Sequence, residues 1–112
     1  MSNKGLDITK NIRLIESLKG DLLLAVSQLY NEMASETCEN IREVALDTLS
    51  DTIIISYLLA RRMGIDYPTM ERQISLKIRL GLLQEHETEK YFGDLSALSR
   101  IRNSIPQTED AS

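Results

Sequence analysis

Three aspartates have the spacing in this chain that is best suited to chemistry. Asp47 and Asp51 are four residues apart, so on a helix they project from nearly the same side. Asp21 lies in the preceding segment, and pairing the two segments about a turn at 34–37 puts it level with Asp51. Carboxylate oxygens from facing helices are ligands that Mg²⁺ or Mn²⁺ prefers. The first hypothesis is a metal site formed by Asp21, Asp47 and Asp51.

A purely structural role for these aspartates is the alternative. The spacing puts Asp51 within an apolar stripe of one helix, and a buried carboxylate without a partner costs several kcal/mol. A neighbouring hydroxyl, or a base such as Arg13, Lys77 or Arg79, would satisfy Asp51 as well as a metal would. The other two aspartates would then be solvated. The rest of the stripe is Ile41, Val44, Thr48, Ile55 and Leu59.

The elements that must position these residues are helices. Apolar residues recur every three or four positions over residues 7–33, which predicts a long first helix. Gly20 weakens its interior and allows a kink there. Ser35 or Thr37 caps the second helix, which runs to 62 or 63 with Gly64 after its C-cap.

Two further elements are predicted in the C-terminal part. A third helix spans about 66–83, with a proline in its first turn. A fourth covers about 85–102, and Gly93 can divide it. The expected fold is all-α, a bundle of four helices, or five if Gly93 divides the last. It forms one domain over 1–103, and the polar residues 104–112 form a flexible tail.

Composition and charge exclude several classes of partner. The 112 residues carry a net charge of -4, which argues against binding to a nucleic-acid backbone. No apolar run reaches membrane-spanning length, and no signal-peptide core is present. The single cysteine, Cys38, fits a reducing cytoplasm. The second helix is apolar on nearly all sides, which predicts self-association as a dimer or a tetramer.

The second helix also resembles a known family. It reads Ala45-Leu46-Asp47-Thr48-Leu49-Ser50-Asp51-Thr52-Ile53-Ile54, followed by Tyr57-Leu58-Leu59 and Met63-Gly64-Ile65-Asp66. This segment resembles the second core helix of the MazG-like all-α NTP pyrophosphohydrolases. Residues 7–12, 18–23 and 86–98 are similar to a small MazG-like subfamily of spore-forming and related bacteria. The resemblance covers roughly residues 7–98.

The resemblance implies hydrolysis of an NTP or dNTP to a nucleoside monophosphate and pyrophosphate, with Mg²⁺ positioning the triphosphate and the attacking water. Asp51 matches the Asp of the superfamily's second ligand pair, and Thr48 replaces the Glu of that pair. On the first helix, Glu-Glu-x-x-Glu corresponds to Gly20-Asp21-x-x-Leu24. Lys77 and Arg79 stand where the superfamily often offers bases to the triphosphate. The implied protein is a pyrophosphohydrolase with a depleted acidic site.

Two alternatives to this enzyme stay open from the sequence. One is a degenerate relative that keeps the helical scaffold and binds nucleotides or partner proteins without turnover, which Thr48 and Leu24 favour. The other is a plain helical interaction protein, in which a base across a homodimer interface satisfies Asp51. All three hypotheses require self-association.

Four other side chains are weaker candidates for a role at the site. His86 could act as an acid or a base, but the glutamates around it are typical of a solvated helix face. Tyr57, Tyr91 and Phe92 could stack on a nucleotide base. Aromatic residues at helical spacing more often belong to the core.

Overall fold

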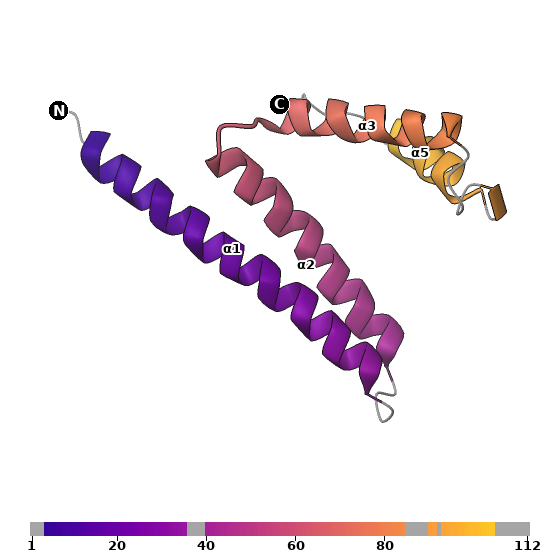
Figure 1. The fold of residues 1–112 in the computed structure, drawn as a ribbon, viewed down its shortest axis with the longest axis horizontal. Coiled ribbons are helices and arrows are strands. Elements are labelled where there is room, and N and C mark those ends of the chain that lie inside the picture. Colours follow the sequence, from indigo (N-terminus) through magenta and orange to yellow (C-terminus); the bar gives the residue numbers. More distant parts are fainter. Residues whose placement is uncertain (1–3, 36–39, 85–89, 92, 105–112) are drawn as a thin grey trace. The chain divides into compact units, whose positions relative to one another are not determined.

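The protein is all-α, as expected (Figure 1). The computed structural model describes residues 4–35, 40–84, 90–91 and 93–104, and these contain no strand. The chain divides into two compact units, Met1–Tyr67 and Pro68–Ser112. The single domain expected over 1–103 stays a prediction. The helices are α1 (Lys4–Ala34), α2 (Ile41–Arg62), α3 (Tyr67–Leu83) and α5 (Asp94–Ser104).

In the first unit, α1 and α2 run antiparallel as a long hairpin (Figure 1). Gly20 does not interrupt α1, which continues through it as one helix. The residues of each helix that face the other recur at alternating spacings of four and three, the pattern of a coiled-coil seam. On α1 they are Asn11, Ile15, Leu18, Leu22, Ala25 and Leu29, and on α2 they are Thr48, Thr52, Ile55, Leu59 and Arg62, all buried or half-buried.

One pair of hydrogen bonds sets the register of the hairpin. The Asn11 side-chain amide donates to the Arg62 carbonyl over 2.9 Å, and the Arg62 guanidinium donates to the Asn11 amide oxygen over 3.2 Å. Each step along α1 towards the loop is matched by one step back along α2. Ala25 is therefore level with Thr48, and the exposed fraction of each is only 5%. The helices approach closely where these two small residues meet.

Hydroxyl groups on the seam side of α2 bond to their own helix. Thr48 donates to the Val44 carbonyl, Thr52 donates to the Thr48 carbonyl over 2.8 Å, and Ser56 donates to the Thr52 carbonyl over 2.7 Å. Their donors are satisfied without help from α1, so the buried hydroxyl of Thr48 carries no desolvation penalty.

The two ends of α2 differ in how well the sequence predicted them. The expected cap at Ser35 or Thr37 is wrong, because Asn40 is the N-cap and makes no side-chain capping bond. Thr37 itself lies outside the described residues. Gly64 follows the C-cap as predicted, with φ at 91°. The next amide, of Ile65, donates to the Ala60 carbonyl over 2.9 Å, which completes a Schellman motif.

The second unit contains α3 and α5. The predicted break at Gly93 is confirmed, since α5 begins at the next residue and the φ of Gly93 is 67°. The helices approach closely at Gly81, where an added Cβ would lie 2.7 Å from Leu95 Cδ1. Arg102 of α5 forms an ion pair with Glu71 of α3. Among the residues that the structure describes, a close helix contact and the ion pair between Glu71 and Arg102 join α3 to α5.

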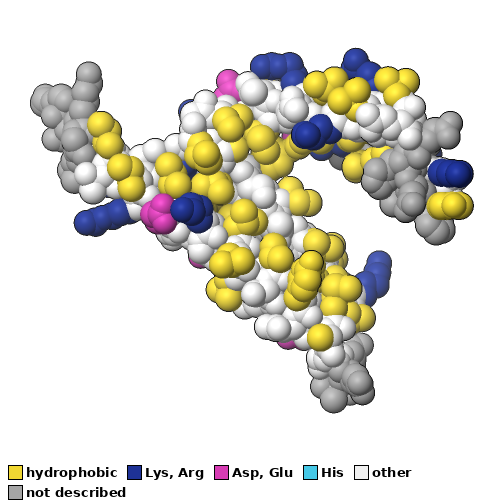
Figure 2. All heavy atoms as spheres, in the orientation of Figure 1, with side chains coloured by type: hydrophobic (Ala, Val, Ile, Leu, Met, Phe, Trp, Pro, Cys, Tyr) yellow, Lys and Arg dark blue, Asp and Glu magenta, His cyan; other side chains and the backbone are white. Residues whose placement is uncertain are grey.

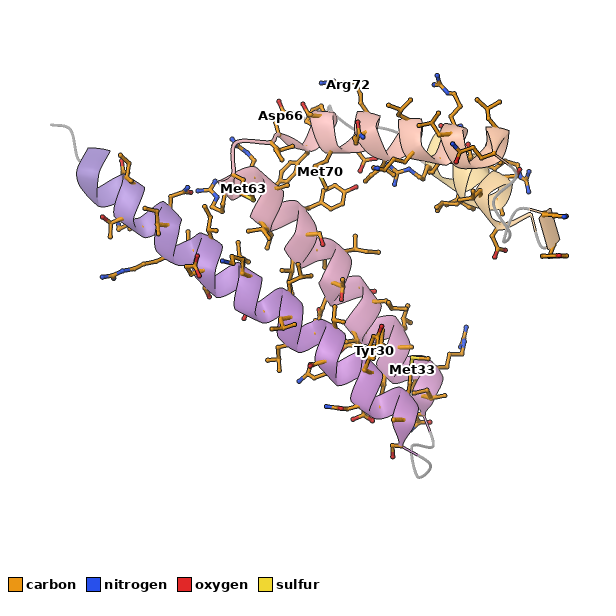
Figure 3. All side chains as sticks on the ribbon, in the orientation of Figure 1. Tyr30, Met33, Met63, Asp66, Met70 and Arg72 are labelled. Atoms are coloured by element: carbon orange, nitrogen blue, oxygen red, sulfur yellow. The ribbon has the colours of Figure 1, made fainter. Side chains whose placement is uncertain are left out.

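Large apolar side chains remain exposed on the hairpin, and hydrophobic atoms gather along both helices in Figure 2. Tyr30 and Met33 project from the last turns of α1 (Figure 3). No helix in the described part of the chain has the length and hydropathy needed to cross a membrane. We name six exposed residues that share one side of the hairpin the apolar face: Ile12, Leu23, Tyr30, Leu46, Leu49 and Ile53.

Candidate functional site

Asp51 is exposed in the structure rather than buried in the apolar stripe. The residues that face α1 centre on Thr48, Thr52 and Ile55. Asp51 precedes Thr52 by one position, a rotation of about 100° that moves its carboxylate to the side of the seam. It forms no ion pair with any described residue, and Arg13, one of the bases named as a structural partner, does not neutralise it. Its charge is available to a ligand.

Asp21 and Asp51 lie on the same edge of the hairpin. Leu14 of α1 and Leu58 of α2 line one hollow at this edge. Asp21 follows Leu14 by seven residues and Asp51 precedes Leu58 by seven, and seven residues are close to two helical turns. Asp21 and Asp51 therefore have the same relative positions on the two helices as Leu14 and Leu58 have, but they lie about two turns nearer the loop. We name the edge that carries Asp21, Asp47 and Asp51 the acidic edge.

In one chain the acidic edge does not assemble a complete metal cage. Among the described residues, no three His, Cys, Asp or Glu side chains lie together in a way that could hold an ion. Magnesium, however, often takes only one or two carboxylates from a protein and completes its shell with waters and substrate phosphates. Asp21 and Asp51 are two carboxylates at one level of the acidic edge, with Asp47 one turn further along α2.

The positions that depart from the superfamily pattern have distinct surroundings. Thr48 stands where the superfamily has a Glu, and it is buried in the seam against α1. Leu24 stands where the first-helix motif has its last Glu, and it is exposed. No carboxylate is available at either position to add to the acidic edge.

Lys77 and Arg79, the predicted triphosphate ligands, are both exposed on α3 but face different surroundings. Arg79 lines two adjoining hollows between α3 and α5, together with Arg102 and Asn103. Lys77 lines neither, because two residues along a helix correspond to a rotation of about 200°. The sequence reasoning missed Arg102 and Asn103. The signal that could have found them is the glycine break at 93, which turns the last helix back along α3.

The two aromatic candidates in the described part of the chain, Tyr57 and Tyr91, have different neighbours. The rings of Tyr57 and Tyr67 pack against each other, with centroids 6.2 Å apart and planes inclined at 38°. Lys90 Nζ lies 5.7 Å from the ring centroid of Tyr91. His86 and Phe92 lie outside the described residues.

Comparison with known proteins gives a match to the MazG-like family over residues 8–95. That segment holds all of α2 and α3, most of α1 and all three aspartates of the acidic edge. The chain belongs to the MazG-like family. Membership relates it to the superfamily of all-α NTP pyrophosphohydrolase-like proteins, which generally depend on a metal ion. No curated protein and no solved structure matches this MazG-like chain significantly.

Proposed function

We propose that this MazG-like protein is a Mg²⁺- or Mn²⁺-dependent pyrophosphohydrolase that cleaves an NTP or dNTP to a nucleoside monophosphate and pyrophosphate. The observation that carries the proposal is that Asp21 and Asp51 occupy one level of the same hairpin edge, inside the segment that the family match covers. Both carboxylates would hold the ion while the substrate phosphates complete its shell. The metal would neutralise phosphate charge and activate the attacking water.

Asp47 has a supporting role in this proposal. It lies one turn from Asp51 on α2, close enough to add negative potential or to orient a metal-bound water. With Thr48 and Leu24 in place of two carboxylates, the site has less charge with which to bind several ions. Slow turnover is the expected consequence, because electrostatic stabilisation of the transition state is usually the largest catalytic term.

A second candidate function is a MazG-like scaffold that binds nucleotides or partner proteins without turnover. The burial of Thr48 favours it, since its hydroxyl is committed to the Val44 carbonyl and cannot reach a ligand at the acidic edge. This scaffold would keep the hairpin and lose the chemistry. The two candidates differ in a single measurable property, the release of pyrophosphate.

Pyrophosphate release from a panel of NTPs and dNTPs, with Mg²⁺ or Mn²⁺, tests the proposed hydrolysis. We expect wild-type turnover, and we expect Asp51→Asn to lower kcat/KM by about 100-fold, the size of effect typical for one lost electrostatic group. Glu16→Gln is the matched control, because Glu16 is an exposed carboxylate that pairs with Lys19 and lies five residues, a rotation of about 140°, from Asp21 on α1. Its activity should stay within about twofold of wild type.

Two results would overturn the hydrolase assignment. One is the absence of pyrophosphate release under every condition, and the other is equal activity of Asp51→Asn and the wild type. A rise in thermal stability with metal and nucleotide, but without turnover, would select the scaffold instead. Ligand at about 100 times its Kd stabilises a folded protein by about 2.7 kcal/mol.

We further propose that the protein works in the cytoplasm as a homo-oligomer, a dimer or a tetramer, assembled through the apolar face. The support is the exposure of large side chains there, which reaches 71% at Leu23 and Tyr30 and 66% at Leu46. Large exposed apolar side chains gathered on one side of a protein are typical of interaction sites. A second hairpin of the same kind would complete a four-helix bundle.

A further inference from the structure

A hollow near the open end of the hairpin has no role in the proposed hydrolysis. We name it the leucine hollow, and its lining residues are Leu14, Leu18, Leu58, Arg61, Arg62 and Tyr67. All of them belong to the compact unit Met1–Tyr67. The hollow lies about two helical turns, roughly 10 Å, from the level of Asp21 and Asp51.

Apolar side chains form most of the lining, and a ligand can reach them. The exposed fraction is 48% for Leu14, 41% for Leu58 and 45% for Tyr67. Leu18, a half-buried residue of the seam between α1 and α2, completes the apolar part. A ligand that covers these side chains removes apolar surface from water, which favours binding. The hollow therefore suits an apolar group.

Local structure holds the ring of Tyr67 in the wall of the hollow. The left-handed φ of Gly64 and the hydrogen bond from the Ile65 amide to the Ala60 carbonyl turn the chain at the end of α2. The ring of Tyr57 then packs against that of Tyr67, with the centroids 6.2 Å apart. A ring that is already packed loses little conformational freedom when a ligand binds. It can contact an aromatic ligand without a large entropic cost.

The two arginines of the hollow differ in what they already bind. Arg62 is half-buried, and its guanidinium donates to the Asn11 amide oxygen over 3.2 Å. Arg61 is exposed and forms no ion pair with any residue that the structure describes. No acidic side chain is among the described residues that line the hollow. The guanidinium of Arg61 is therefore open to an anionic group.

The charge and the volume of the hollow limit the ligands that fit it. A single open guanidinium matches one carboxylate, because two parallel N–H donors meet two oxygens that share one charge. The volume is about 240 Å³, larger than the roughly 150 Å³ of an apolar cavity that binds benzene. The hollow thus has room for an aromatic ring system of small size.

We propose that the leucine hollow binds a small aromatic carboxylate, with the rings against Leu14, Leu58 and Tyr67 and the carboxylate on Arg61. A nucleotide base suits the hollow less well, because its polar edges would lose hydrogen bonds to water that leucine side chains cannot replace. The proposal goes beyond the proposed hydrolysis, since neither a nucleotide nor a metal ion takes part.

Calorimetric titration of the full chain, in a chelating buffer without nucleotide, tests the leucine hollow. The probe is naphthalene-2-carboxylate. Naphthalene-2-carboxamide has the same rings without the charge, and acetate has the charge without the rings. We expect saturable binding of the carboxylate, binding of the carboxamide that is weaker by about tenfold or more, and no measurable binding of acetate.

Replacing Arg61 tests the recognition of the charge. Arg61→Gln should weaken binding of the carboxylate by about tenfold or more and leave binding of the carboxamide unchanged, because only the carboxylate uses the guanidinium. Arg42→Gln is the matched control, since it removes one exposed positive charge from the other end of α2, about 28 Å away. It should bind both probes as the wild type does.

Filling the hollow tests the position of the rings. Leu58→Trp places a bulkier side chain in the lining, so it should weaken binding of the carboxylate and of the carboxamide alike. Leu83→Trp, at a leucine of α3 that is 75% exposed, adds the same ring outside the hollow and should change neither. Circular dichroism of both variants should show the helix content of the wild type.

Four results would overturn the proposal. They are the absence of saturable binding, equal affinity for the carboxylate and the carboxamide in the wild type, equal losses in Arg61→Gln and Arg42→Gln, and displacement of the bound naphthalene-2-carboxylate by ATP. The last result would make the hollow part of a nucleotide site. Pyrophosphate release is measured separately with metal and nucleotide, so either proposal can fail while the other stands.

Discussion

Residue 48 has little room for a larger side chain in the hairpin. Thr48 is level with Ala25, and both are nearly inaccessible to solvent. A Glu at the same position, as in the superfamily pattern, would have to bury a carboxylate between two helices or push them apart. Threonine at this position therefore avoids a buried charge between the helices, besides lacking the carboxylate that the superfamily pattern has there.

Replacing Thr48 by Glu tests this constraint. We expect Thr48→Glu to lower the free energy of unfolding by about 3 kcal/mol, because an uncompensated charge would enter the seam. Urea unfolding followed by circular dichroism measures the change. Gln28→Glu, at an exposed position on the acidic edge of α1, should alter stability by no more than about 0.5 kcal/mol. An equally stable Thr48→Glu with raised turnover would instead place residue 48 at the active site.

The placement of Asp51 shows where the spacing of apolar residues failed to predict which side of α2 a residue occupies. The sequence led us to place Asp51 within an apolar stripe, because Thr48 was counted among the residues of that stripe but Thr52 was not. Thr52 faces α1 because its hydroxyl bonds to the Thr48 carbonyl and leaves its methyl group to pack. With Thr52 included, the spacing of four and three moves Asp51 to the edge.

The helices themselves were largely predictable, since periodicity and glycine position determine where they end. The predicted end of α2 is confirmed by the Schellman motif at Gly64, and the start of α5 by Gly93. The start of α2 was not predictable from capping residues, because Asn40 makes no side-chain capping bond. The hollows between α3 and α5 could not be predicted either, because they form only where the two helices pack together in the folded chain.

Two glycines in the first unit predict opposite effects of alanine. Gly64 has a left-handed φ of 91°, so Gly64→Ala should destabilise the protein by about 1–2 kcal/mol. Gly20 lies inside α1 with no atom within 4 Å of an added Cβ, so Gly20→Ala should stabilise it by about 0.5–1 kcal/mol. Thermal unfolding of both variants beside the wild type checks the two signs. A stabilising Gly64→Ala would contradict the assigned C-cap.

The apolar face is the feature that matters most for the whole molecule. Its six large side chains, which lie on both helices of the hairpin, are exposed in the single chain. Each Å² of apolar surface that assembly removes from water stabilises the assembled protein by roughly 25 cal/mol. Assembly with a second copy is therefore the expected source of much of the protein's stability.

A charge on the apolar face should prevent assembly. We expect the wild type to sediment as a dimer or a tetramer, and Ile53→Glu to sediment as a monomer at the same concentration with a lower Tm. The control Gln28→Glu adds the same charge at an exposed residue seven positions, about two turns, after Asp21, on the acidic edge instead of the apolar face, and should stay assembled. Analytical ultracentrifugation over a hundredfold concentration range makes the measurement. A wild type that is monomeric throughout would rule out self-association.

The two hydrogen bonds between Asn11 and Arg62 have a further consequence for the alignment of α1 with α2. Because the seam repeats every seven residues, sliding α1 past α2 by one repeat, about 10 Å, would still put apolar groups against apolar groups. Only one alignment lets the amide of Asn11 reach the end of α2. The two bonds therefore favour the native alignment over shifted alignments that bury a similar apolar surface, and they keep Asp21 level with Asp51.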